Sequence, residues 1–149
     1  MTDRMAGVLC TVGYEAATLD QVIAKLKAAG VEVLIDVRAV AASRRAGFSK
    51  TILRTTLEAN GIAYDHIRAL GTPKPGREAA RKGRIAEMEA IFADHMATPE
   101  AQDGLAAATR IATDRPAALL CYEADAAGCH RRIVADLIRD RAGLDVRDL

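Results

Sequence analysis

The chain has 149 residues, of which 50% are hydrophobic and 28% are charged, with a formal net charge of +1 at pH 7. These values are typical of one soluble globular domain and argue against a general nucleic-acid binder, which is usually strongly basic. No apolar run approaches the roughly 20 residues of a membrane span, and the start of the chain lacks the apolar segment of a signal peptide. Three cysteines, an odd number, suit a reducing compartment. We therefore expect one domain over residues 1–149, located in the cytoplasm and not in a membrane.

The first half of the chain alternates between strand and helix signals. Thr18 followed by Gln21 is a capping-box pattern, and apolar residues at helical spacing then continue to Gly30. Helices are therefore predicted at 18–30 and, after a capping serine, at 50–60. Short β-branched and apolar runs predict strands at 8–12, 31–37 and 62–67. The segment 70–76 holds two prolines and two glycines, so it is predicted to be a loop.

The second half continues the alternation. Apolar residues at helical spacing predict one long amphipathic helix over 78–97, and Thr98 with Pro99 restarts a helix that runs to about 113. The remaining elements are predicted as a strand at 117–121, a helix at 130–141 that ends at Gly143, and a short strand at 144–149. Strands that alternate with helices imply a parallel sheet covered on both faces. We expect a single-domain, three-layer α/β sandwich.

Polar and reactive side chains gather at the ends of the predicted strands, where parallel sheets bind their ligands. In chain order these residues are Thr11, Gly13 and Tyr14, then Asp36 and Arg38, then Tyr64 and His66, and finally Cys121, Tyr122 and Glu123. The following helix opens with Cys129, His130 and Arg131. We expect most of these side chains, among them Asp36, His66, Cys121 and Glu123, to share one edge of the sheet.

Charge is distributed unevenly along the chain. Between Asp36 and Glu58, and again between Asp65 and Glu78, every charged residue is basic. If the two segments meet in space, they favour an anion. We expect such an anion near Ser43 and the start of the helix at His130, in contact with Arg38, Arg44 or Arg131.

Cys129 is the candidate nucleophile. It opens a helix beside His130 and Arg131, and free N–H groups and positive charge lower a thiol pKa. Glu123 is a candidate general base, and it is equally suited to an ion pair with Arg131. The opposite reading is that Cys129 packs as a small buried residue, covered by the alanines at 124, 126 and 127, because an apolar setting raises a thiol pKa.

The sequence also offers residues that could bind a metal ion. They include soft ligands in adequate number, namely Cys121, Glu123, Cys129, His130 and His66, but the C-x7-C-H spacing differs from the short spacing of zinc knuckles, so no metal ligand is predicted. A disulfide between Cys121 and Cys129 fits the geometry of the intervening loop. In the cytoplasm such a bond would be a transient redox state.

Two further features have both a structural and a functional interpretation. Asp36 and Arg38 form either a plain ion pair or a pair in which the carboxylate aims the arginine at a phosphate or carboxylate. The rings of Tyr14, Phe48 and Tyr64 lie near the predicted edge, where they either stack on a planar ligand or pack in the core.

A set of short motifs spans most of the chain. They are Thr-x-Gly-Tyr at 11–14, Asp-Val-Arg at 36–38, Ser-Arg at 43–44, Gly-Phe-Ser-Lys at 47–50, Tyr-x-His at 64–66, Leu-Gly at 70–71, Cys-Tyr-Glu at 121–123 and Cys-His-Arg at 129–131. Together, from Thr11 to about Leu137, this set resembles the DUF488 family. One departure is that Ala41 and Ala42 stand where members often have a proline. The resemblance implies an α/β fold and a site that the members share. It implies no reaction, because the family is a domain of unknown function.

Two function classes follow from these observations. The first is an enzyme acting on a small anion, such as a nucleotide or phosphorylated metabolite, with Cys129 or Glu123 in the chemical step. The second is a non-catalytic module that reads a nucleotide or, less favoured, a nucleic-acid end through the same basic edge. The chain has no P-loop run, and one glycine after the first strand argues against a dinucleotide fold, so no particular cofactor is indicated.

Overall fold

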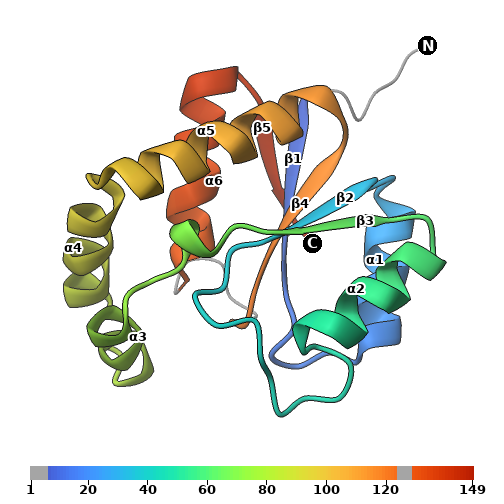
Figure 1. Cartoon of the computed structure of the whole chain (residues 1–149), viewed down its shortest axis with the longest axis horizontal. Coiled ribbons are helices and arrows are strands. Elements are labelled where there is room, and N and C mark those ends of the chain that lie inside the picture. The colour runs from blue at the N-terminus through green and yellow to red at the C-terminus, as the bar shows by residue number, and fades with distance from the viewer. Residues whose placement is uncertain (1–6, 124–128) are drawn as a thin grey trace.

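A single five-stranded sheet organises the chain in a computed structural model that describes residues 7–123 and 129–149. The strands are β1 (Val8–Gly13), β2 (Val33–Asp36), β3 (Ala63–His66), β4 (Ala117–Cys121) and β5 (Asp145–Asp148). Their order is β3-β2-β4-β1-β5, and each neighbouring pair is parallel. The predicted α/β sandwich with a parallel sheet is therefore confirmed (Figure 1).

Helices cover both faces of the sheet, as Figure 1 shows. One face packs against α1 (Leu19–Ala28) and α2 (Lys50–Ala59), and the other against α3 (Lys74–Arg81), α4 (Ile85–Met96), α5 (Pro99–Asp114) and α6 (His130–Ala142). Successive strand residues alternate between these two cores, as strand geometry requires. Leu119 and Cys121 of β4, for example, face the α3–α6 core, whereas Leu120 faces the α1–α2 core.

Local sequence signals explain where several elements begin and end. Thr18 and Gln21 form both bonds of a capping box at the start of α1. Thr98 caps α5 by accepting from the Ala101 amide, with Pro99 at the first helical position. Gly143 ends α6 at φ +70°, a backbone conformation that glycine adopts without strain. These boundaries agree with those predicted from the sequence.

The segment after β3 differs from its prediction. A 3-10 turn, η1 (Arg68–Leu70), leads to α3, which already begins at Lys74, inside the stretch predicted to be a loop. The prolines and glycines of this stretch lie before or within the first turn of α3, where helices tolerate them. The single helix predicted over 78–97 is in fact two helices, because the chain turns at Gly83 with φ +76°.

The topology places a crevice beside β4. The connections that leave β1 and β2 pass through α1 and α2 on one face, whereas those that leave β3 and β4 pass through α3–α6 on the other (Figure 1). β4 lies between β1 and β2. The connection that leaves β4 therefore runs over one face of the sheet, whereas the connections that leave its two neighbours run over the other face. Such a switch point is where open α/β sheets bind their ligands.

Among residues 7–123 and 129–149, no helix has the length and apolar character of a membrane-spanning helix.

Candidate functional site

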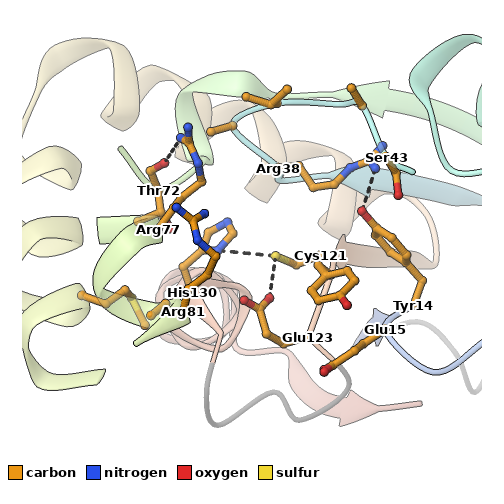
Figure 2. Close-up of a pocket in the computed structure, with 16 residues that line it drawn as sticks. Tyr14, Glu15, Arg38, Ser43, Thr72, Arg77, Arg81, Cys121, Glu123 and His130 are labelled. Carbon is orange, nitrogen blue, oxygen red and sulfur yellow. Dashed lines mark hydrogen bonds between the residues drawn. The ribbon is translucent and has the colours of Figure 1, made fainter. Parts of the chain in front are cut away.

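A cleft of about 610 Å³ opens at the carboxyl edge of the sheet. Its walls come from the segments after β1, β2 and β4, from α3 and α4, and from the start of α6 (Figure 2). The polar lining residues are Tyr14, Glu15, Arg38, Ser43, Thr72, Arg77, Arg81, Cys121, Tyr122, Glu123 and His130. The cleft therefore contains six of the predicted site residues, namely Tyr14, Arg38, Ser43, Cys121, Glu123 and His130.

Close backbone packing holds the walls together. The amides of Tyr14 and Glu15 both donate to the carbonyl of Tyr122, at 3.1 and 2.8 Å. Gly13 packs so tightly that a Cβ atom there would overlap the Glu123 carbonyl and lie 2.8 Å from the Arg131 guanidinium. This position therefore needs glycine because two loops and a buried side chain meet at it. Gly13 shapes the site without contributing a functional group.

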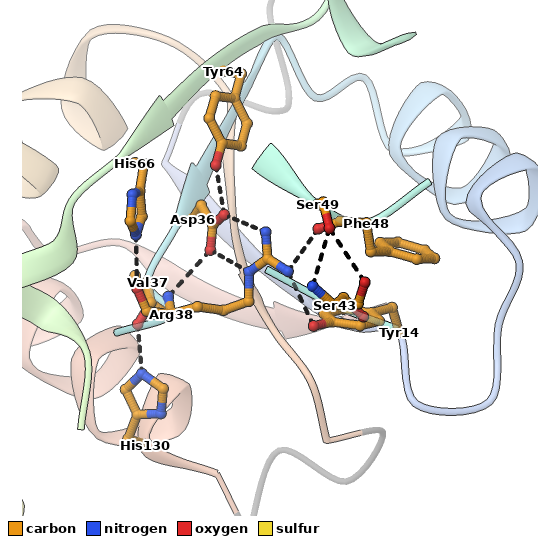
Figure 3. Close-up of polar contacts among 10 residues, drawn as sticks. All are labelled: Tyr14, Asp36, Val37, Arg38, Ser43, Phe48, Ser49, Tyr64, His66 and His130. Atoms are coloured by element: carbon orange, nitrogen blue, oxygen red, sulfur yellow. Dashed lines mark hydrogen bonds and ion pairs between the residues drawn. The ribbon is translucent and has the colours of Figure 1, made fainter. Parts of the chain in front are cut away.

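Asp36 and Arg38 form a buried, two-pronged ion pair, shown in Figure 3. The Nε and Nη2 groups of Arg38 donate to the two carboxylate oxygens of Asp36 at 2.9 and 2.7 Å, and Nη1 donates to the Tyr14 hydroxyl and the Phe48 carbonyl. The Tyr64 hydroxyl donates to the same carboxylate at 2.6 Å. Asp36 is 0% exposed and Arg38 only 5%. This network joins the segments after β1 and β2 to β3 and to the residues before α2.

Ionisation in this network follows from the contacts. Burial opposes the charge of Arg38, but its bonds to Asp36 and Tyr14 outweigh burial and raise its pKa. Burial, followed by the hydrogen bond to Asp36, raises the pKa of Tyr64. The structure contains the Asp36–Arg38 ion pair that both interpretations include, and four guanidinium hydrogen bonds of Arg38 are made within the protein.

The aromatic rings divide between core and cleft. Tyr14 stacks on Phe48 with ring centroids 4.3 Å apart, and both rings are buried, as is Tyr64. These three rings therefore pack in the α1–α2 core. Tyr122, in contrast, is 44% exposed and lines the cleft, with its ring edge-on to Tyr14 at 5.4 Å. Its ring is the one best placed to meet a planar ligand.

Two thiols and an imidazole form a cluster on the other face of the sheet. Nδ1 of His130 lies 3.6 Å from Sγ of Cys121 and 3.7 Å from Sγ of Cys129. Nε2 of His130 lies 2.7 Å from the carbonyl oxygen of Val37, and Sγ of Cys121 lies 3.5 Å from Oε2 of Glu123 (Figures 2 and 3). All three cysteines of the chain are free thiols. We call Cys121, Cys129 and His130 the thiol–imidazole cluster.

Of the two readings of Cys129, the structure has the buried one. Cys129 does precede α6 as its N-cap, but it is 3% exposed, and burial, together with Cys121, raises its pKa well above the usual value. His130 opposes this shift without overcoming it. Burial also lowers the pKa of His130, but its contacts with Cys129, the Val37 carbonyl and Glu123 raise that pKa overall. The alanines at 124, 126 and 127, predicted as a cover, lie outside the described residues.

Two cleft arginines were missed as site residues. Arg77 and Arg81 line the cleft from successive turns of α3, and Arg77 donates to the Thr72 carbonyl at 2.9 Å (Figure 2). Their spacing of four residues puts both on one helix face. The signal was present in the sequence, but predicting a loop at 70–76 removed the turn that orients Arg77. The two basic segments do meet here, through Arg38 and Arg77.

The remaining predicted residues lie around the cleft. Nε2 of His66, at the end of β3, is 2.7 Å from the Arg38 carbonyl. The four residues predicted to share one edge do lie at or just after the carboxyl ends of β2, β3 and β4, namely Asp36, His66, Cys121 and Glu123. The side chain of Arg131 is buried and donates to the Glu123 carbonyl. Thr11 is inside β1 and donates to Asp148 of β5. Arg44 lines a separate, smaller hollow that Ala17 also lines.

Fold and site thus define a parallel α/β protein with a polar cleft at the switch point of its sheet. A family model described as "Domain of unknown function DUF488" matches residues 18–138. The chain belongs to this family, as its motifs indicated. Comparisons with the curated proteins and with the solved structures gave no match.

Proposed function

We propose that the cleft binds a small anionic ligand, phosphate- or nucleotide-like, and that a thiol-dependent reaction takes place on it at Cys121. The observation that carries this proposal is that cationic side chains and reactive side chains lie on opposite sides of one cleft. Arg77 and Arg81 lie on the α3 side, and the cleft wall that Cys121 and His130 form contains a thiol and an imidazole in contact. Binding charge on one side and reactive groups on the other is the arrangement that an enzyme for an anionic substrate needs.

Arginines suit an anion for geometric reasons. Their planar guanidinium groups present parallel N–H donors that match a phosphate or carboxylate. Arg77 is half-buried and anchored to Thr72, so little side-chain freedom is lost when it binds a ligand. Glu15 lies on the opposite side, next to Tyr14, so the anionic group of a ligand belongs on the α3 side (Figure 2).

Cys121 replaces Cys129 as the candidate reactive thiol. Cys121 lines the cleft and has two acceptors for its proton, Nδ1 of His130 at 3.6 Å and the carboxylate of Glu123 at 3.5 Å. A nearby base is what converts a thiol to the nucleophilic thiolate. His130 and Glu123 thus keep the base roles that the sequence suggested. The reducing cytoplasm expected from the cysteine count would keep these thiols available.

A non-catalytic nucleotide-binding module is the second candidate. The exposed ring of Tyr122 at the cleft supports it, because a flat ring there can stack on a base. A binding module, however, has no need of a buried thiol–imidazole cluster beside the ligand. A nucleoside phosphate that binds without any thiol dependence would favour this second candidate.

Calorimetric titration with inorganic phosphate and with a nucleoside monophosphate tests the anion site. Reduced, chelator-treated protein should bind at one site per chain, and Arg77→Ala should weaken binding roughly tenfold or more, as expected for loss of one charge-assisted hydrogen bond. Arg81→Ala should weaken it by less, since this side chain is exposed. Arg84→Ala, an exposed arginine beyond the cleft lining, is the matched control. An equal loss of affinity in all three variants, or no binding of either compound by the unmodified chain, would refute the anion site.

A further inference from the structure

The thiol–imidazole cluster has the composition of a metal site. Among the residues that the structure describes, the donor atoms of Cys121, Cys129 and His130 all lie within 4.8 Å of one another. Cys121 comes from the end of β4, and the other two come from the start of α6. Seven residues separate the two cysteines in the sequence, but the fold brings them together. The long spacing that argued against a metal is therefore no obstacle in three dimensions.

The separations match those between the ligands of a tetrahedral zinc ion. Zn–S bonds of about 2.3 Å and Zn–N bonds of about 2.0–2.1 Å, at the tetrahedral angle, place sulfur and nitrogen about 3.5–3.6 Å apart. The two sulfur-to-Nδ1 distances are 3.6 and 3.7 Å. A zinc-bound carboxylate oxygen would lie about 3.5–3.7 Å from a ligand sulfur, and Oε2 of Glu123 is 3.5 Å from Cys121. Both sulfur atoms therefore already lie at the distance from Nδ1 that a shared zinc ion requires, whereas Glu123 lies near Cys121 outside this group.

Both thiols of the cluster approach one nitrogen atom. The carbonyl of Val37 accepts a hydrogen bond, so Nε2 of the neutral His130 ring carries the proton and Nδ1 offers one lone pair. This lone pair can accept from only one thiol at a time, and Cys121 has the Glu123 carboxylate as its other acceptor. A cation at the centre would engage the lone pair and both sulfurs at once.

The surroundings also resemble those of metal ligands. A metal-bound histidine usually donates its other ring N–H to a carboxylate or backbone carbonyl, as His130 does to Val37. Cys129 is the N-cap of α6, where the positive end of the helix stabilises thiolates. Two thiolates and one divalent ion carry no net charge, which suits a buried position. Cys121 and His130 also line the cleft, so an ion bound by them would lie at its wall.

We propose that Cys121, Cys129 and His130 bind one divalent transition metal ion of the zinc class, with the fourth position toward the cleft and beside Glu123. Soft thiolate and imidazole ligands in a tetrahedral set favour this class over magnesium or calcium. Two cysteines, one histidine and an open position are the ligand pattern of a catalytic zinc site. The metal site stands on its own geometry and does not rest on the proposed function; with an ion bound Cys121 is a ligand, so the thiol-dependent reaction proposed above belongs to the metal-free chain.

Titration with Co²⁺ tests the metal site. Full-length, reduced protein is stripped of metal with a chelator and titrated without oxygen. One equivalent should produce a near-ultraviolet sulfur-to-cobalt charge-transfer band and the intense visible bands of four-coordinate cobalt, and Zn²⁺ should abolish both. Cys121→Ser and Cys129→Ser should each reduce the charge-transfer intensity by about half and weaken binding at least tenfold, since each removes one of the proposed thiolate ligands. Absence of the band, or only the weak visible bands of six-coordinate cobalt, would overturn the proposal.

Cys10→Ala is the matched control, because Cys10 is a buried thiol in β1 on the opposite face of the sheet. It should retain the full cobalt spectrum, and loss of the band in this variant alone would overturn the assignment. Since serine at a buried position can disturb folding, X-ray absorption of the zinc-loaded wild-type chain gives a second readout. Two sulfur neighbours at about 2.3 Å are expected, and a shell of nitrogen and oxygen alone would contradict the site.

The two proposals can fail separately. If phosphate binds and Cys121 reacts with alkylating reagents but no cobalt spectrum appears, the metal site is wrong and the thiol-dependent function stands. If cobalt binds through two thiolates but no anion binds in calorimetry, the metal site stands and the proposed function is wrong.

Discussion

His130 at the start of α6 and Val37 at the end of β2 are joined by a hydrogen bond of 2.7 Å from Nε2 to the backbone carbonyl. The bond ties the helix to the sheet and fixes which ring nitrogen carries the proton. Nδ1 consequently faces both thiols with its lone pair. His66 makes the same kind of bond, also 2.7 Å long, to the next carbonyl, that of Arg38 (Figure 3). Two histidines therefore hold consecutive peptide groups at the edge of the cleft.

This relationship predicts the tautomer of His130. At a pH well above its raised pKa the neutral ring should carry its proton on Nε2, with Nδ1 unprotonated. Nitrogen-15 NMR of the imidazole distinguishes the two tautomers directly. His95, whose Nε2 also lies 2.7 Å from a backbone carbonyl, that of Ala69, is an internal reference in the same spectrum. A proton on Nδ1 of His130 would leave no lone pair for a thiol or a metal and would contradict the account.

The Asp36–Arg38 pair should contribute strongly to stability. Asp36→Asn leaves a buried arginine without its counter-charge, so the free energy of unfolding should fall by about 3–5 kcal/mol. Urea denaturation measures this change. Asp136→Asn, at an exposed pair with Arg132, is the control and should cost less than about 1 kcal/mol. A double change, Asp36→Asn with Arg38→Met, should cost much less than the sum of its single changes; strict additivity would mean that the two side chains do not act together.

The raised pKa of Tyr64 predicts how the free energy of unfolding changes with pH in the alkaline range. Its pKa is raised in the folded chain, whereas an unfolded tyrosine titrates near about 10. Between these two values the folded chain retains a proton that the unfolded chain has lost, so rising pH favours unfolding. The contribution of Tyr64 to the unfolding free energy is therefore fully present below about pH 10 and declines above it. Tyr64→Phe should show a shallower decline in urea titrations above that pH, and an identical decline would exclude the effect.

Gly13 should tolerate no side chain. A Cβ there overlaps the carbonyl of Glu123, so Gly13→Ala must displace a wall of the cleft, and overpacking of this kind costs about 1–3 kcal/mol. Gly61→Ala is the comparison, because Gly61 has open space around it and only its φ of +76° disfavours alanine. We expect Gly13→Ala to weaken phosphate binding as well as stability, and Gly61→Ala to affect stability alone. Phosphate calorimetry on both variants decides this.

The fold was largely predictable because its signals are local. The capping residues Thr18 and Thr98 and the apolar run 117–121 each mark an element that the structure contains. The break at Gly83 was not predicted, because the apolar periodicity continues past it and an isolated glycine is tolerated in many helices. The helical start at Lys74 was hidden by prolines and glycines that also occur in loops.

The site was only partly predictable, because burial is set by distant segments. The strand-end rule correctly brought Asp36, His66 and Cys121 to one edge. It could not show that Phe92 of α4 packs edge-on against His130, in the core that also buries Cys129. Nor could it show that Tyr14 and Phe48, which are distant in sequence, accept hydrogen bonds from Arg38.

Alkylation of Cys121 in the presence and absence of an anion tests the central claim most directly. Reduced, metal-free protein is treated with iodoacetamide, and the labelled cysteine is located by peptide mass spectrometry. We predict that Cys121 is modified before Cys10 and Cys129, and that phosphate slows its modification with a concentration dependence equal to its calorimetric affinity. Arg77→Ala should raise the phosphate concentration needed for protection by the same factor by which it weakens binding, without changing the rate in the absence of phosphate. Modification of Cys129 before Cys121, or a Cys121 rate that saturating phosphate leaves unchanged, would contradict an anion site facing this thiol.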